Sequence, residues 1–373
     1  MILNKIFRYL ILCALPFILP ALACAENLSE IPAIKFQVSK QSVSLVRLSD
    51  IGATEIVANK NIALINSGRS IRVLKANSNK IENKLISALP HNSFWYGPVC
   101  VMRDSFVIAV TEYPEEQRSK EINTHRGGFK AGPSSNRFII ITPSSPDRYI
   151  KTLKVSSRPP LNYDGIKVVK SNQFSAHVQS CAWDGNEIYF GSYGSFGKAN
   201  FEKGTIDLVE EDEGLAFNRF ALLVERKAIW VGIDEGGMGG AFLEMKPLEG
   251  ESRSFSINTE NDIISFNTLL RHRGLLLVGT SHGLFMLNEA SGKFQCFDFG
   301  ESLSGLSVSS LVSCKGLLWV FIGGEWLTVD IKKNHAVHYI NTSSTKLSTG
   351  IPFGNGWILG GVSGVWKCQF ASR

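Results

Sequence analysis

The chain has 373 residues, of which 44% are hydrophobic and 19% charged, and its formal net charge is +6 at pH 7. Because this positive balance is mild and no basic stripe runs along the chain, the sequence argues against a nucleic-acid-binding protein. Few charged residues together with 34 glycines are typical of many short strands joined by tight turns, and not of long surface helices.

The N-terminal 25 residues have the pattern of a secretory signal peptide. Lys5 and Arg8 give a positively charged start, residues 10–23 are apolar and uncharged, and Ala-Cys-Ala at 23–25 is a small-residue cleavage site. The apolar stretch is too short for a comfortable transmembrane span, and no later segment is long enough for one. The sequence therefore predicts export to the periplasm or the cell exterior, with lipid anchoring at Cys24 as the alternative.

The next part of the chain contains strand-like runs at irregular intervals. Short β-branched and aromatic runs predict strands at 33–38, 62–66, 70–74, 106–110 and 138–141. Residues 79–89 could form a short helix. The polar segment 111–137 separates two strands of one unit, and it is too long for a turn. Such a segment is either a flexible loop or a cap over a central channel.

A four-stranded unit repeats from about residue 178 onward. In the clearest copy, at 264–299, the apolar strand Leu275–Val278 ends in Gly279-Thr280 and is followed by a tight turn at 281–283. Glycines that end the second strand recur at Gly191, Gly232, Gly279, Gly323 and Gly360. Their separations of 41, 47, 44 and 37 residues match the length of a propeller blade.

These observations predict an all-β fold, a β-propeller of seven four-stranded blades, with six or eight blades as alternatives. The last unit lacks a fourth strand. We expect the N-terminal strand Ala33–Val38 to complete it, because a ring closed in this way hides its strand edges. An open solenoid is the alternative. In the propeller, residues 26–373 form a single, monomeric domain with a long polar loop at 111–137.

The units at 264–299 and 308–340 resemble the two-component-regulator propeller repeat. Gly274–Thr280 with Gly283-Leu284-Phe285 matches that repeat well, and Gly316–Val320 matches it in part. Such repeats usually form extracytoplasmic sensor propellers fused to a membrane-spanning kinase, a part that this sequence does not contain. The resemblance implies a fold and a compartment, and it implies no catalytic residue.

Five dispersed cysteines follow the predicted signal peptide, at Cys100, Cys181, Cys296, Cys314 and Cys368. They form no C-x-x-C pair and have no histidine at ligand spacing, so no zinc site, other metal or cofactor is predicted. We expect buried thiols that pack as small apolar groups, with one disulfide as the alternative.

Catalytic motifs are missing from the sequence. The nearest approach to a nucleophile elbow is the glycine- and serine-rich stretch Gly191–Gly197, but it falls at a turn between two strands instead of between a strand and a helix. The site must therefore be sought from the geometry of the fold.

In a propeller, the turns between second and third strands share one face with the links between blades, and that face is the usual binding surface. The repeat alignment places these candidates there: Tyr96, His177, Tyr193, Arg219, Asp234, Glu235, Asn267, His282 and Glu325. His282 is unexpected, because most units have small residues at this turn.

Three hypotheses follow. The first is a non-enzymatic binding module that recognises a protein, glycan or small molecule on this face. The second is a lyase or hydrolase with His125, His177 or His282 as general base near Arg219 at the channel mouth. The third is a scaffold without a ligand.

Overall fold

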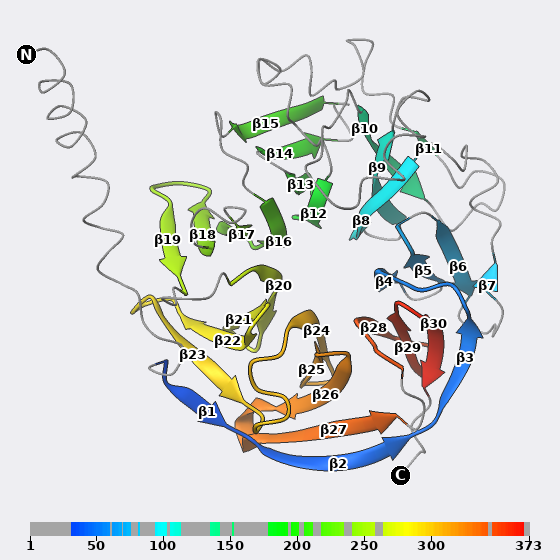
Figure 1. The fold of residues 1–373 in the computed structure, drawn as a ribbon. Helices are drawn as coiled ribbons and strands as arrows, with labels where there is room; N and C mark the ends of the chain where they lie inside the picture. Colours follow the sequence, from blue (N-terminus) through cyan, green and yellow to red (C-terminus); the bar gives the residue numbers. More distant parts are fainter. Residues whose placement is uncertain are drawn as a thin grey trace, which may run out of the picture.

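The structure is a computed structural model (Figure 1), and its described residues are 31–59, 62–68, 70–75, 81–82, 94–102, 105–112, 135–141, 151–152, 178–192, 195–200, 205–211, 218–234, 241–257, 264–341 and 345–368. Apart from one 3-10 helix, η7 (Ile331–Lys333), the regular elements within these ranges are all strands.

The described strands form seven sheets. The first sheet contains β4 (Glu55–Ala58), β5 (Ile62–Asn66), β6 (Ile71–Lys75) and β7 (Ile81–Glu82). The second contains β8 (Phe94–Met102), β9 (Ser105–Glu112), β10 (Ser135–Ile141) and β11 (Lys151–Thr152). The third contains β12 (Val178–Trp183), β13 (Ile188–Ser192), β14 (Ser195–Asn200) and β15 (Thr205–Glu211). The fourth contains β16 (Asn218–Val224), β17 (Ala228–Asp234), β18 (Ala241–Pro247) and β19 (Arg253–Ser256).

Each of the last three sheets also takes in a strand from the N-terminal part of the chain. The fifth contains β20 (Phe266–His272), β21 (Leu275–Thr280), β22 (Gly283–Asn288) and β23 (Lys293–Asp298), with β1 (Ala33–Lys35). The sixth contains β24 (Val308–Cys314), β25 (Leu317–Ile322), β26 (Glu325–Asp330) and β27 (His335–Asn341), with β2 (Gln37–Val43). The seventh contains β28 (Thr349–Phe353), β29 (Gly356–Gly361) and β30 (Gly364–Cys368), with β3 (Leu45–Ser49).

The sheets stand around a common centre, and the innermost strands are β4, β8, β12, β16, β20, β24 and β28 (Figure 1). Consecutive strands within a sheet pair antiparallel, as the hairpin pattern of the sequence predicted. The protein is therefore an all-β β-propeller.

The predicted N-terminal strand at 33–38 is corrected by the structure. β1 pairs parallel with β23, and β2 pairs parallel with β27, so these two strands lie outside the fifth and sixth sheets. The strand beside the last repeat is β3, in which Leu45 opposes Cys368. The physical reason is that the outer strands of three successive sheets each offer a free edge, and the passing chain hydrogen-bonds to all three.

Seven apolar clusters fill the spaces between neighbouring sheets. One of them joins the two ends of the ring: Ile358 and Val365 of the seventh sheet pack with Ile56 and Ile65 of the first. Trp319 and Trp357 are buried in the cluster between the sixth and seventh sheets, with their ring centroids 3.7 Å apart. These rings are thus core residues and offer no flat surface to a sugar.

The recurring glycines let the sheets approach each other. A Cβ added to Gly232 would lie 2.5 Å from the Cβ of Phe266 in the next sheet, and one added to Gly279 would lie 2.7 Å from Cγ1 of Val308 in the next sheet. Gly323 is different from the others, because it lies in the turn after β25 and has a positive φ of 61°.

Two other predictions from the sequence concern segments that lie partly outside the described residues. Residues 81–82 form β7, so the short helix expected at 79–89 is not present at these two residues, and the remainder of that range is outside the described residues. Of the segment 111–137, the two ends belong to β9 and β10, and residues 113–134 lie outside the described part.

Candidate functional site

One face of the ring carries the turns 281–282, 323–324 and 362–363 and the links 50–54 and 299–307, and we call it the loop face. The start of each innermost strand lies beside a turn of this face: the N–H of Ser281 donates to the carbonyl of Ser265, and that of Gly323 to the carbonyl of Ser307. Four of the candidate residues from the sequence lie near this face and have described side chains, namely Asp234, Asn267, His282 and Glu325.

The side chains of the other candidate residues lie outside the described part of the structure. Tyr96 lies near the start of β8 and Arg219 near the start of β16, where the backbone alone is described. His177, Tyr193 and Glu235 are outside the described residues, as is His125.

A chain of hydrogen bonds runs across two sheets to His282. The hydroxyl of Ser265 donates to Oδ2 of Asp234 over 2.7 Å, and the N–H of Ser265 donates to Oγ of Ser281 over 3.0 Å. Oγ of Ser281 lies 2.8 Å from Nδ1 of His282. Asp234 is only 9% exposed, so the chain begins on a buried carboxylate of β17 and ends on a half-buried imidazole of the loop face.

The backbone of the same turn is also fixed. The N–H of His282 donates to Oγ1 of Thr280 over 3.0 Å, and that hydroxyl donates to the carbonyl of Gly283. Gly283 has a φ of 127°, a conformation that residues with a Cβ rarely adopt. The backbone that carries the imidazole is thereby fixed, and the ring itself contacts Oγ of Ser281.

Asn267 and Glu325 have other roles on this face. The amide of Asn267 donates to Oγ of Ser307 over 3.2 Å and to the carbonyl of Val308 over 3.0 Å, so it joins the fifth sheet to the sixth. Glu325 is exposed and lies 3.3 Å from Nε2 of His338 on the neighbouring strand. The structure thus brings Asp234 and His282 together through two serines, whereas Asn267 contacts Ser307 and Val308, and Glu325 contacts His338.

Exposed apolar side chains also lie on the loop face. Ile51 is 53% exposed in the link before β4, Leu306 is 38% exposed in the link before β24, and Val362 is 89% exposed in the turn between β29 and β30. Ile51 and Val362 sit on adjoining segments, since Gly52 packs against the carbonyl of Val362. Because Ile51 and Val362 lie on adjoining segments, their exposed side chains form one apolar patch, and contiguous apolar patches are typical of contact surfaces.

Sequence reasoning missed Glu55, the first residue of β4. The N–H of Val99 donates to its Oε2 over 2.8 Å, and its neighbour Asn66 donates to the carbonyl of Gly97 over 2.7 Å. Burial raises the pKa of Glu55 to about 7, although hydrogen bonds from Val99 and Asn66 act in the opposite direction. The only signal in the sequence was a carboxylate at the start of an innermost strand.

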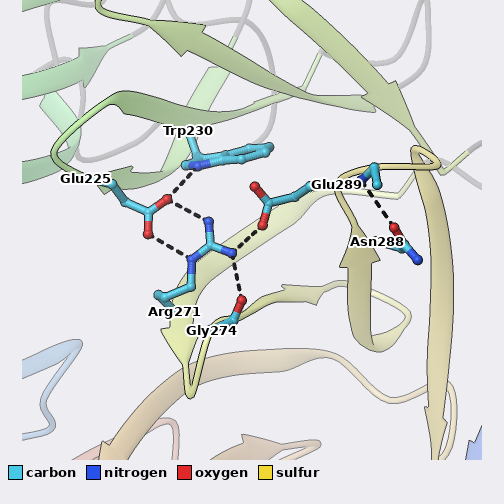
Figure 2. A network of polar contacts seen from close by, with 7 residues as sticks. Glu225, Trp230, Arg271, Gly274, Asn288 and Glu289 are labelled. Carbon is cyan, nitrogen blue, oxygen red and sulfur yellow. Dashed lines mark hydrogen bonds and ion pairs between the residues drawn. The ribbon is translucent and has the colours of Figure 1, made fainter.

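A different polar cluster fastens the opposite face (Figure 2). Arg271 donates to both oxygens of Glu225, over 2.8 and 2.6 Å, and also to Glu289. The indole of Trp230 donates to Glu225 over 2.9 Å, and Gly274 accepts from Arg271. Because every member has a partner within the cluster, we interpret it as a clamp between the fourth and fifth sheets.

The described residues contain neither a metal-binding cluster nor a membrane-spanning helix. No group of three or more His, Cys, Asp or Glu side chains in the described ranges could hold a metal ion. Within the same ranges, no helix has the length and apolarity needed to cross a bilayer.

Comparison with known proteins supports the fold. No family model matches the chain, and no curated protein matches it. Among solved structures, the chain is similar to the extracellular domain of BT4673, described as a hybrid two component system, from B. thetaiotaomicron, with a TM-score of 0.57 and 10% identity over 91% of this chain and 40% of that one. It therefore spans less than half of that structure's length.

Two further solved structures have the same likeness. A catalytically inactive virginiamycin B lyase from Staphylococcus aureus with quinupristin has a TM-score of 0.56 and 13% identity over 88% of this chain and 98% of that one. The WD40 beta propeller domain of Doa1 has a TM-score of 0.54 and 8% identity over 88% and 95%. At these identities the likeness shows a β-propeller, and it supports the expected resemblance to two-component-regulator propellers at the level of the fold.

Proposed function

We propose that this protein is an exported binding module whose loop face recognises a partner with an apolar component. The observation that carries the proposal is the polar chain from buried Asp234 to His282, on a face that also exposes Ile51, Leu306 and Val362. A fixed polar group and exposed apolar side chains on one face are the composition of a recognition surface.

The finer architecture belongs to the same proposal. Each of the seven sheets counts as one blade of a closed, monomeric ring, and β3 completes the last blade beside β30. Closure by β3 is supported by the cluster that packs the seventh sheet against the first. The partner is a protein, a glycan or a small molecule, and the mild net charge argues against nucleic acid.

The binding test is a thermal-shift screen of the purified protein against peptides, sugars, nucleotides, metabolites and divalent ions. A ligand present at 100 times its Kd should stabilise the folded state by about 2.7 kcal/mol. Val362→Ser and Ile51→Ser should weaken that response. Leu248→Ser is the matched control, because Leu248 is 58% exposed on the opposite face, where its N–H donates to Lys227. An equal loss of response in the control would contradict the loop face as the binding surface.

The second candidate is a lyase or hydrolase with His282 as general base. It is favoured by the 2.8 Å contact of His282 with Ser281, which would orient the imidazole. If mass spectrometry shows that a bound ligand is converted, and His282→Ala stops conversion but preserves binding, the enzyme is supported. Binding without conversion supports the module.

Export has its own test. The intact mass of protein recovered from the periplasm or medium should correspond to a chain that begins at Glu26. An acylated chain that begins at Cys24 would support lipid anchoring instead, and an uncleaved chain confined to the cytoplasm would contradict export.

A further inference from the structure

Two cysteines face each other between the second and third sheets. In β8, Val99 packs into the cluster shared with the first sheet, and the next residue, Cys100, packs into the cluster shared with the third. This is the alternation expected of a strand. From the other side, Cys181 of β12 packs against the same cluster as Cys100.

The backbones of β8 and β12 approach closely just before the two cysteines. Gly97 makes this possible, because a Cβ at that position would lie 3.0 Å from the carbonyl oxygen of Val178. Both strands are innermost in their sheets (Figure 1), and both cysteines come three residues after this point: 100 − 97 = 3 and 181 − 178 = 3. Cys100 and Cys181 therefore lie at the same depth in the ring.

The side chains also affect each other electrostatically. The pKa of the Cys181 thiol is raised well above its usual value, first by a hydrogen bond with Cys100, then by burial and by the charges of Cys100 and Glu55. Cys181 is half-buried and Cys100 is buried, so a small reagent should reach Cys181 first. Cys296 is similarly half-buried, but its Sγ donates to the carbonyl of Phe297 in the fifth sheet.

We propose that Cys100 and Cys181 form a reversible disulfide that joins the innermost strands of the second and third sheets. In the first step, which alkaline pH favours, the Cys181 thiol loses its proton and its sulfur attacks a low-molecular-weight disulfide, from which one thiol leaves. Cys100 then loses its proton and attacks Sγ of Cys181, which forms the protein disulfide and releases the second thiol. The protein is oxidised by two electrons and loses two protons, and the reagent is reduced to two thiols.

This bond would change the protein in two ways. It closes a loop between residues 100 and 181, which restricts the unfolded chain and so favours the folded state. It also fixes the contact between two sheets on the channel side of the ring. The inference is independent of the proposed binding function, since neither cysteine belongs to the loop face.

The test uses the purified, reduced protein and oxidised glutathione as the disulfide reagent. After incubation, free thiols are blocked with N-ethylmaleimide in denaturant, and the protein is digested and analysed by mass spectrometry. We expect a peptide pair linked through Cys100 and Cys181, a loss of two titratable thiols per chain, and a higher Tm that dithiothreitol reverses. Matched variants are Cys181→Ser, Cys100→Ser and Cys296→Ser.

The variants separate this bond from non-specific oxidation. Cys296→Ser should still lose two thiols and gain the same Tm, whereas Cys100→Ser and Cys181→Ser should give neither change. Circular dichroism of the reduced variants checks that they are folded, and Cys181→Ala replaces Cys181→Ser if the latter is not. Oxidation that leaves Cys100 and Cys181 free, or links another pair instead, would overturn the proposal, as would a linked protein with a lower Tm than the reduced one.

Discussion

An arginine stabilises each of two junctions between sheets, but one arginine pairs with carboxylates and the other with neutral groups. Between the fourth and fifth sheets, half-buried Arg271 meets the carboxylates of Glu225 and Glu289 (Figure 2). Between the seventh and first sheets, the partners of buried Arg72 of β6 among the described residues are neutral: the hydroxyl of Ser49 and the carbonyls of Ile51 and Gly52.

The pKa directions follow from that difference. Hydrogen bonds and charge interactions with Glu225 and Glu289 raise the pKa of Arg271, and those with Arg271 lower that of Glu225. Burial without a carboxylate lowers the pKa of Arg72, whose Nε has no hydrogen-bond partner among the described residues. At the first junction, the half-buried positive charge is compensated by carboxylates. At the second, the charge of Arg72 is compensated by hydrogen bonds to backbone carbonyls.

The largest effect is expected at Arg72. Its side chain is 2% exposed, so Arg72→Ala leaves a cavity and removes the donors to Ile51 and Gly52. We expect a loss of about 3 kcal/mol in the free energy of unfolding, measured by urea denaturation. Arg253→Ala is the control, because Arg253 is exposed and should cost far less. A change of Arg72→Ala no larger than that of the control would show that the last junction does not depend on this arginine.

The ion pair at Arg271 should contribute less. Glu225 and Arg271 have side chains 27% and 24% exposed, so water and salt screen part of the interaction. Glu225→Gln should lower the free energy of unfolding by about 1–2 kcal/mol, and the loss should shrink in high salt. A double-mutant cycle with Arg271→Ala measures the coupling directly. Coupling that is absent, or independent of salt, would contradict the role of charge at this junction.

Glu55 extends the comparison to pH, because it is in the same sheet as Arg72 and its hydrogen-bond partners among the described residues, Val99 and Asn66, are neutral. Its folded pKa of about 7 lies above the usual 4.5, so the folded state binds more protons between these values. The stability from the protonated carboxyl is complete below pH 4.5 and is lost as pH rises to 7. We expect about 1 kcal/mol, less than the full shift implies, since the residue is half-buried.

Glu55→Gln isolates this effect. Burial lowers the pKa of His272, so its contribution rises with pH up to about 6.5 and opposes that of Glu55. In the wild-type protein, the contributions of Glu55 and His272 to the pH dependence of stability have opposite signs and overlap. The variant lacks the contribution of Glu55 and keeps that of His272. The difference in unfolding free energy between wild type and Glu55→Gln should therefore fall from pH 4.5 to 7. A difference that is constant with pH would mean that Glu55 titrates with the same pKa in the folded and unfolded states.

The comparison also shows what could be predicted from the sequence. The hairpin pattern was readable because it is local: Arg273 and Gly274 both have positive φ, at 51° and 84°, as a two-residue turn between strands requires. The recurring glycines were readable for the same reason. The course of β1, β2 and β3 was not, because each pairs with a strand about 250 or more residues away and no local signal records the partner.

In the candidate site, too, residues with a local signal in the sequence were predicted, and residues whose role depends on a distant segment were not. His282 was identified because it is unusual for a turn, and the structure places it at the end of a fixed polar chain. Ser265 and Ser281 were missed, since serine is ordinary in links and turns and gains its role only from the neighbouring sheet. Arg72 was missed because one charged residue in an apolar strand normally faces water.

The smallest effect is expected from the ion pair beside the last junction, between Arg47 and Asp50. Their charged atoms are 3.0 Å apart, but the side chains are 53% and 86% exposed, and Arg47 also donates to the carbonyl of Ser363 over 2.7 Å. Because water screens the pair and the arginine retains that second bond, Asp50→Asn should change the free energy of unfolding by less than about 0.5 kcal/mol. Urea denaturation alongside Arg72→Ala measures both at one junction. A loss comparable to that of Arg72→Ala would mean that surface charge holds this end of the ring together, whereas a negligible loss assigns its stability to the buried arginine and the apolar cluster.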